Sequence, residues 1–285
     1  MGQQKAAAQP ERRTEGVTSN QASFGVIAGD GGNRLTARQQ FRRRPAAYAM
    51  PASSFDQKFI AFLISISGVA KSDRVVEVAC GNGSTTLGFA ERCAYAIGVD
   101  VIEEPLRMAR MAAAERSLRN ADFIVSEVER LSFEDSNFNG ALCRFSFHHF
   151  ANPARVFAEL ARVVAPGGWM VIADMVASED PAKAEFHNQM ERLCDPTHSR
   201  TLPASEFERM FAEHNFRLAL KVDRDARLTL DEWLRFGGAP PENVARLREM
   251  VATAIDEDRA GLRFTREGDQ IRLVHNSVSF VLEKE

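Results

Sequence analysis

The stretch that decides the fold is residues 73–83, which read Asp-Arg-Val-Val-Glu-Val-Ala-Cys-Gly-Asn-Gly. It begins with a short run of β-branched residues, which predicts a buried strand. Gly81 and Gly83 end the run, and helical spacing resumes in residues 84–94. Only glycine lets the backbone turn tightly here and approach a ligand without a Cβ in the way. The stretch therefore predicts a strand, a glycine turn and a helix, with a ligand at the turn.

The alternation of strands and helices continues on both sides of this stretch. An amphipathic helix is expected from Ser54 to Gly68, ahead of the first strand. The later elements are expected as strands at 94–100, 122–126, 139–145 and 169–175, and as helices at 103–118 and 152–165. This alternation is typical of a parallel sheet with helices on both faces, a doubly wound α/β fold. Ligands of such folds bind at the carboxyl ends of the strands.

The pattern changes after Val176. The elements expected there are helices at 181–193, 204–214, 230–236 and 242–255, and strands at 216–222 and 270–283. The sequence thus predicts seven strands, of which the last two follow the alternating part of the chain.

Composition excludes several classes of function. The chain has 285 residues and a net charge of −3 at pH 7, so it lacks the positive field of a sequence-independent nucleic-acid binder. Its four cysteines form no C-x-x-C pair, which predicts reduced thiols and no zinc finger. The most apolar stretch, residues 59–70, is shorter than the roughly 20 residues that span a membrane. We expect a cytoplasmic monomer or homodimer, with a small-molecule substrate and no nucleic-acid partner.

Residues 1–44 differ from the rest of the chain. They hold eight basic residues against three acidic ones, and they lack apolar periodicity. We expect a flexible basic arm, followed by one domain over residues 45–285. A transit peptide is the alternative interpretation of the arm.

Asp100 ends the second expected strand, at a depth where a carboxylate can accept hydrogen bonds from ribose hydroxyls. The dinucleotide fingerprint requires a third glycine at position 86, where this chain has Thr86. This difference disfavours a nicotinamide-dependent oxidoreductase. It remains an alternative, because either kind of cofactor would use Asp100.

Glu77-x-x-Cys-Gly81-x-Gly83, followed by Gly-Val-Asp100, resembles the first two motifs of class I S-adenosylmethionine-dependent methyltransferases. Three later segments agree: residues 127–133 resemble the family's D-A-x-x-L-P-F segment, 143–150 the segment after the fourth strand, and 162–168 the R-V-L-x-P-G-G lead into the fifth. The likeness covers roughly residues 45–175. It is greatest to the small-molecule group that includes the ubiquinone and menaquinone C-methyltransferases, whose relatives carry a D-P-S-H-x-R stretch similar to residues 195–200.

The resemblance implies a mostly parallel seven-stranded sheet with an antiparallel C-terminal strand. It also implies a helical lid over the acceptor, at about 177–215 and 228–268, and S-adenosylmethionine as the cofactor, released as S-adenosylhomocysteine. The cofactor-binding residues that it implies are Tyr48, Glu77, Gly81, Gly83, Asp100, Val101, Glu127, Val128 and Arg144.

Several of these residues have specific implied roles. The two glycines would let the backbone pass the methionine part, Glu77 would hold its ammonium through the loop, and Asp100 would bind the ribose. Glu127 would reach the adenine amino group, although the family usually has Asp there. Tyr48 would close over the carboxylate end of the cofactor; a simple hydrophobic staple is the alternative.

Methyl transfer is an in-line displacement at a sulfonium carbon, so positioning supplies most of the catalysis. A base near pH 7 helps when the acceptor is a phenol, enol or hydroxyl, and histidine suits that role. His148 and His149 follow the fourth strand, and adjacent side chains point apart, so at most one of them should face the substrate. A histidine that caps the next helix is the alternative.

The acceptor pocket is predicted to include Glu191, His198 and Arg200, with a surface Glu-Arg pair as the alternative. No metal site is predicted, because His187, Glu191 and His198 do not have the H-E-x-x-H spacing. The sequence therefore predicts a methyltransferase for a small, apolar or aromatic metabolite, methylated at carbon or oxygen. One alternative keeps the cofactor: a cyclase or pericyclase that binds S-adenosylmethionine. Another is a catalytically silent binding subunit.

Overall fold

The computed structural model describes residues 36, 39 and 54–285, which belong to the compact unit that spans residues 34–285. Tyr48 lies outside the described residues, as does nearly all of the expected basic arm. No helix in the described part of the chain is long and apolar enough to cross a membrane.

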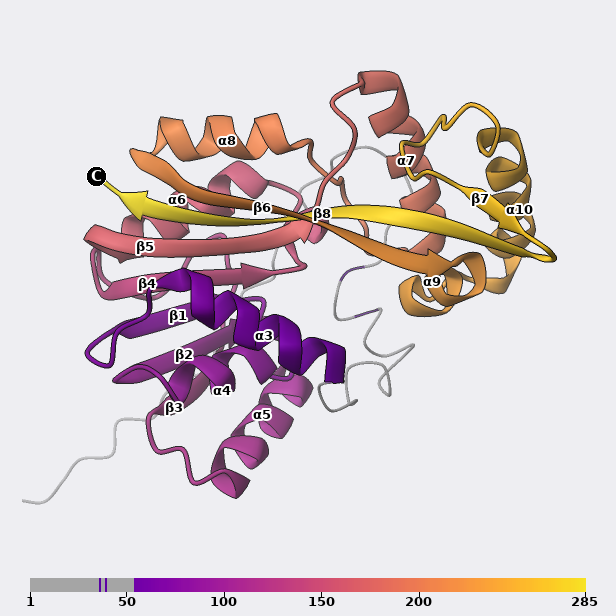
Figure 1. Cartoon of the computed structure of the whole chain (residues 1–285). Helices are drawn as coiled ribbons and strands as arrows, with labels where there is room; N and C mark the ends of the chain where they lie inside the picture. The colour runs from indigo at the N-terminus through magenta and orange to yellow at the C-terminus, as the bar shows by residue number, and fades with distance from the viewer. Residues whose placement is uncertain (1–35, 37–38, 40–53) are drawn as a thin grey trace, which may run out of the picture. The chain divides into compact units, whose positions relative to one another are not determined.

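A mostly parallel sheet forms the centre of this unit (Figure 1). Its five parallel strands are β1 (Arg74–Val78), β2 (Tyr95–Asp100), β3 (Ala121–Val125), β4 (Phe138–Arg144) and β5 (Val164–Met175). β8 (Gln270–Lys284) pairs antiparallel with β5, and β6 (Phe216–Thr229) pairs antiparallel with β8, which gives the order β3-β2-β1-β4-β5-β8-β6. The predicted α/β class and the antiparallel C-terminal strand are thus confirmed. A three-residue strand, β7 (Thr265–Glu267), also pairs with β8; it is too short for periodicity to reveal.

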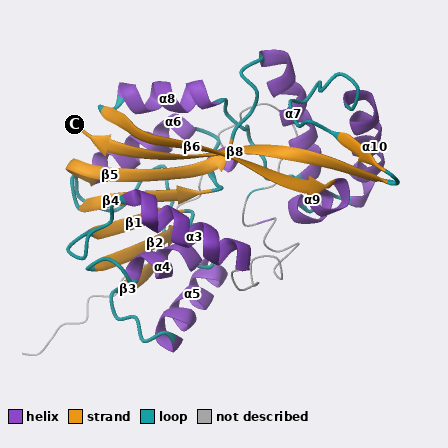
Figure 2. Ribbon diagram, viewed as in Figure 1, coloured by secondary structure: helices purple, strands orange, loops and turns teal. Residues whose placement is uncertain are grey.

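Helices cover both faces of the sheet (Figure 2). On one face α3 (Ser54–Ser67) and α4 (Ser84–Ala90) pack in one apolar cluster, and α5 (Glu103–Glu115) packs with α4 in another. On the other face, α6 (Pro153–Val163) and α8 (Ala204–Glu213) share a cluster. β1 serves both faces, because Val75 packs in the α3 cluster while Val76 and Val78 pack in the α6 cluster. A strand buried on both faces reads as a continuous apolar run, which explains why residues 74–79 carry so clear a signal.

β6 and β8 extend well past the other strands and carry a separate helical region. Helices α7 (Pro181–Cys194), α9 (Leu230–Gly237) and α10 (Pro241–Ala254) pack there around Met190, Trp233, Val251 and Leu273, the last of which lies on β8. Sequence predicted the first strand of this pair only over 216–222, whereas β6 continues to Thr229. Its second half is rich in charge and has low β-propensity, and pairing with β8 keeps it extended.

Candidate functional site

The glycine turn, residues 79–83, joins β1 to α4 with backbone in the left-handed region. Gly81 has φ +53° and Gly83 φ +72°, and Ala79 also has a positive φ of 53°. A Cβ on Gly83 would lie 2.5 Å from Phe123 Cε1, whereas a Cβ on Gly81 would meet no atom within 4 Å. Gly83 is therefore required by packing, while Gly81 faces space that a ligand can enter.

Asp100 lies beside this turn, at the carboxyl end of β2. Its side chain is buried and accepts hydrogen bonds from the backbone N–H of Gly81 at 2.8 Å and of Ile102 at 3.0 Å. Burial raises the pKa of Asp100, and the backbone donors act in the opposite direction. The turn and the carboxylate predicted for the ribose are thus held together.

Glu77 and Arg144 lie on the neighbouring strands β1 and β4. Glu77 is buried and accepts a hydrogen bond from the Thr86 hydroxyl. Burial raises its pKa to about 7, and the positive charge of Arg144 acts to lower it. Arg144 Nη1 lies 3.0 Å from Asp56 Oδ1 of α3. The carboxylate predicted for the methionine ammonium is therefore close to losing its charge, and a further cation beside it would favour the ionised form.

The residues predicted to surround the adenine are spread over different environments. Glu127 is exposed after β3, and Val101 is half-buried after Asp100. Val128 is buried in the apolar cluster of α6, close in sequence to Leu131 of the same cluster. Its side chain is thus committed to the core.

His148 forms a buried pair with Asp174, the carboxylate near the end of β5. His148 Nδ1 lies 2.6 Å from Asp174 Oδ1, and Asp174 Oδ2 accepts from the backbone N–H of Ser146 and Phe147. A carboxylate can only accept, so Nδ1 donates and Nε2 carries the free lone pair. Burial acts to lower the pKa of His148, but Asp174 raises it above its ordinary value.

His149 points to a different partner. Its Nδ1 lies 3.1 Å from Thr197 Oγ1, and the Thr197 hydroxyl donates to Asp195 Oδ1 at 2.6 Å. Burial, followed by the nearby charge of His148, lowers the pKa of His149 to about 4. The two adjacent histidines have separate partners, and only His148 has a carboxylate directly on its ring.

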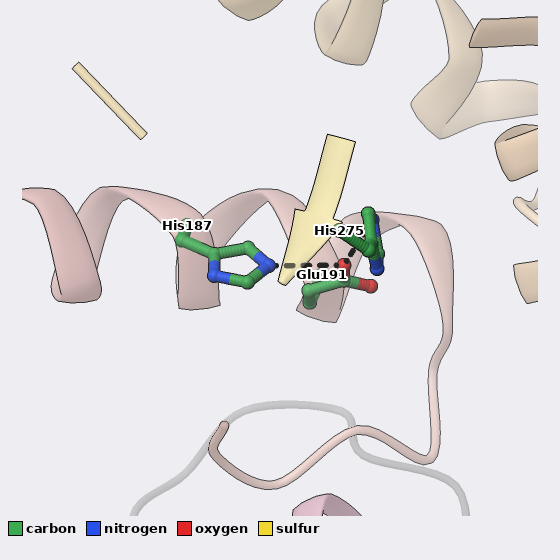
Figure 3. A group of neighbouring side chains, drawn as sticks. All are labelled: His187, Glu191 and His275. Carbon is green, nitrogen blue, oxygen red and sulfur yellow. Dashed lines mark hydrogen bonds and ion pairs between the residues drawn. The ribbon is translucent and has the colours of Figure 1, made fainter. Parts of the chain in front are cut away.

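Three more histidines lie near this pair, and with it they form what we call the histidine cluster: His148, His149, His187, His198 and His275. The His198 ring stacks on His148 with centroids 5.7 Å apart, and its Nε2 lies 2.8 Å from Asn188 Oδ1. Burial lowers the pKa of His198 to about 2. His187 of α7 and His275 of β8 converge on Glu191 (Figure 3).

Arg200 does not join the other two residues predicted for the acceptor pocket. It is exposed, and its Nη1 lies 3.0 Å from Glu206 Oε1 at the start of α8. Glu191 and His198 are buried. The structure therefore brings two of the three residues together, and the third forms a surface pair.

Comparison with known proteins gives this architecture a family. The model of a family described as a methyltransferase domain matches residues 76–172. The chain is also 30% identical over 225 residues to the uncharacterized methyltransferase YcgJ of Bacillus subtilis strain 168, covering 79% of this chain and 89% of that protein. The chain belongs to the methyltransferase family. The crystal structure of YcgJ, at 27% identity, matches this methyltransferase with a TM-score of 0.75 and covers 80% of this chain and 99% of that one.

A shorter match is to a relative whose name places it in ubiquinone biosynthesis. The chain is 32% identical over 113 residues to the ubiquinone biosynthesis O-methyltransferase of Dechloromonas aromatica strain RCB, covering 39% of this chain and 47% of that protein. The resemblance to class I methyltransferases with quinone-modifying relatives is thus confirmed, and the oxidoreductase alternative is set aside.

Sequence reasoning missed two residues of this methyltransferase that the structure places at the centre of the cluster. Asp174 had a visible signal, since it is the one charged residue in the apolar run Trp169–Met175. His275 had none, because it lies on β8, far along the chain from α7, and only the folded sheet brings it to Glu191.

Proposed function

We propose that this methyltransferase moves the methyl group of S-adenosylmethionine to a carbon or oxygen atom of a small, apolar or aromatic acceptor. The observation that carries the proposal is the His148–Asp174 pair, with a free Nε2, at the carboxyl edge of the same sheet as the glycine turn and Asp100. Parallel strands bring their carboxyl ends to one edge. The edge thus combines a cofactor-type turn with a base.

The residues of the turn fit the cofactor. Asp100 would accept from the ribose hydroxyls, and the backbone of Gly81 borders the space that the ligand needs. Glu77 would pair with the ammonium of the cofactor. This positive charge would favour the ionised form of Glu77, which burial alone disfavours. Glu127 would accept from the adenine amino group. The cofactor, when bound, supplies an electrophilic methyl on a sulfonium sulfur.

Arg144, Val101 and Tyr48 complete the proposed cofactor site. Arg144 would face the cofactor carboxylate, and Val101 would border the adenine. The buried side chain of Val128 leaves its main chain for the cofactor. Tyr48 remains a prediction from sequence.

His148 is the proposed base. When the methyl–sulfur bond breaks and the methyl–acceptor bond forms, His148 Nε2 would take the acceptor proton, and Asp174 would stabilise the resulting imidazolium. The acceptor would lie against His148, beneath α7 and residues 195–200, where His198 packs. The backbone carbonyl of His148 accepts from the N–H of Ser199 and Arg200, so this covering segment is tied to the base.

The cofactor is tested by calorimetric titration with S-adenosylhomocysteine. We expect micromolar binding that weakens at least about tenfold in Asp100→Ala, since a hydrogen bond to a charged group contributes about 1.5–3 kcal/mol. Asp122→Ala is the matched control, because that exposed carboxylate bonds Tyr95 at the opposite end of the same strand pair. Equal weakening in both variants, or no binding by the wild type, would contradict the assignment.

The reaction is tested by incubating the protein with methyl-labelled S-adenosylmethionine and a panel of phenols and enols. We expect labelled product and S-adenosylhomocysteine in equal amounts. Product without S-adenosylhomocysteine would mean the cyclase alternative. Cofactor binding with no conversion of any acceptor in the panel would favour the silent binding subunit.

A further inference from the structure

Three side chains of the cluster region have no part in the proposed methyl transfer. They are His187 and Glu191, one helical turn apart on α7, and His275 on β8. All three are at least 95% buried, and one ligand atom from each lies within 4.8 Å of the others. In Figure 3 the two rings approach the carboxylate from different elements. Charged and imidazole groups buried together need a compensating partner.

The contacts of His275 indicate that its Nε2 atom lacks a hydrogen-bond partner among the described residues. Its Nδ1 lies 2.9 Å from the thioether sulfur of Met175, which can only accept, so Nδ1 carries the ring proton. In the neutral ring, Nε2 is then a bare lone pair. It makes no hydrogen bond within the described structure, yet lies 3.3 Å from Glu191 Oε1, which is also an acceptor. Two acceptors that face each other at this distance need a proton or a metal ion between them.

The spacing of the ligand atoms suits a metal ion. His187 Nε2 and His275 Nε2 lie 3.2 Å and 3.3 Å from Glu191 Oε1. Ligands at about 2.0–2.1 Å from a tetrahedral zinc ion are separated by about 3.3 Å. The third edge, between the two imidazole nitrogens, is at most 4.8 Å, so a small ring rotation completes the site.

Outer contacts orient two of the three groups. Trp233 Nε1 donates to Glu191 Oε2 at 3.4 Å, which leaves Oε1 to face both histidines. The Met175 contact fixes the tautomer of His275 with Nε2 inward. Metal-binding histidines and carboxylates are characteristically held by such second hydrogen bonds.

We propose that His187, Glu191 and His275 bind one divalent ion of the first transition row, of the Zn²⁺ or Fe²⁺ type. Two imidazoles and a carboxylate suit these borderline ions, whereas Mg²⁺ and Ca²⁺ prefer oxygen ligands alone. The ion displaces the proton that His187 Nε2 shares with Glu191. It joins α7 to β8, next to the base, since Met175 directly follows Asp174. This proposal gives Glu191 a role other than the acceptor contact predicted from sequence.

The site is tested on the full-length chain, stripped with a chelator and titrated with Zn²⁺ or Co²⁺. We expect one equivalent of tight binding, a visible Co²⁺ spectrum, and a rise in unfolding temperature of about 5 °C or more at a hundredfold excess over Kd. A stripped wild type that binds no equivalent of either ion, or gains no stability from it, overturns the proposal. The buried groups would then share only protons.

Variants locate the ion. Glu191→Gln keeps a group that can accept from Trp233 but removes the charge, and His275→Gln removes the imidazole; each should lose the single equivalent and the Co²⁺ spectrum. Trp233→Phe should weaken binding about 10–100-fold, as for other outer partners. His214→Gln is the control, because His214 is the one histidine outside the cluster and packs near Phe157.

Circular dichroism checks that each variant folds, and if Glu191→Gln does not, His275→Gln and the wild-type titration decide. Binding that persists in both ligand variants, or that falls equally in His214→Gln, overturns the proposal.

Discussion

The glycine turn and the histidine cluster lie on the same sheet but are assembled in opposite ways. Glu77, Gly81, Gly83 and Asp100 come from one strand-turn-helix-strand segment. The cluster joins residues that follow β4 with others on α7, after α7 and on β8. The first region comes from one continuous segment, so a short sequence motif can encode it. The second exists only when distant segments pack, so its chemistry depends on the stability of the whole fold.

Replacing His148 should separate the two regions most sharply. His148→Ala removes the base and should lower kcat by about 10²–10⁴-fold, while S-adenosylhomocysteine affinity stays within a factor of two or so, because the turn is unaffected. Steady-state kinetics with an acceptor from the screen, together with calorimetry, measures both. His214→Gln serves as the control for loss of a histidine. A parallel loss of cofactor affinity would mean that the regions are not separate.

Within the turn, substitution of the two glycines by alanine should destabilise the fold by different amounts. Gly83→Ala should destabilise the fold by about 2–4 kcal/mol, since it combines left-handed backbone with a clash against Phe123 and Ala109. Gly81→Ala carries only the backbone cost, about 1–2 kcal/mol, but should weaken cofactor binding. Urea unfolding and calorimetry on both variants check this. Equal destabilisation would show that the close packing at Gly83 relaxes freely.

The pH dependence of kcat/KM tests the assignment of His148 as the base of the histidine cluster. A base must be neutral to take a proton, so kcat/KM should rise as pH increases through the pKa of His148 and be lost below it. Asp174 raises that pKa against the effect of burial, and Glu191 and Asp195 add to it. In Asp174→Asn the pKa falls, so the acidic limb should move to lower pH even though the maximum rate drops. If the acidic limb of the pH–rate profile does not move in Asp174→Asn, His148 paired with Asp174 is not the base.

The smallest effect is expected at the exposed edge of the cofactor site. Glu127→Ala should weaken S-adenosylhomocysteine binding about 2–10-fold, as for one hydrogen bond in contact with solvent. The same variant should bind S-inosylhomocysteine as the wild type does, because that analogue lacks the adenine amino group. Glu129→Ala, two residues further on, is the control. Equal losses for both ligands would remove Glu127 from adenine recognition.

Sequence was sufficient for the local features. The β-branched run before Gly81 predicted β1, and the same reasoning located the other parallel strands, because each is a short apolar run next to a helical segment. This holds even for β3, which lies at the edge of the sheet and is only partly buried. His148 was found because it follows a strand end. The full length of β6 was not, since its charged second half owes its conformation to β8 rather than to propensity.

The contents of the cluster could be predicted only in part. Glu191, His198 and Arg200 were chosen together from a resemblance; the structure buries Glu191 and His198 and leaves Arg200 on the surface. His187 was noticed beside Glu191, but the third group, His275, is far along the chain. No spacing rule connects α7 to a strand that reaches it only through sheet order.

The position of β8 also has a consequence for how the protein is made. β8 lies between β5 and β6 in the sheet, although it is the last of the three to be synthesised. As the chain leaves the ribosome, β1 to β5 can pair in turn, while the edge of β5 and all of β6 must wait for residues 270–284. Exposed strand edges invite association with other chains. We expect the nascent protein to depend on chaperones most strongly during this interval, and folding to finish late and in one concerted step.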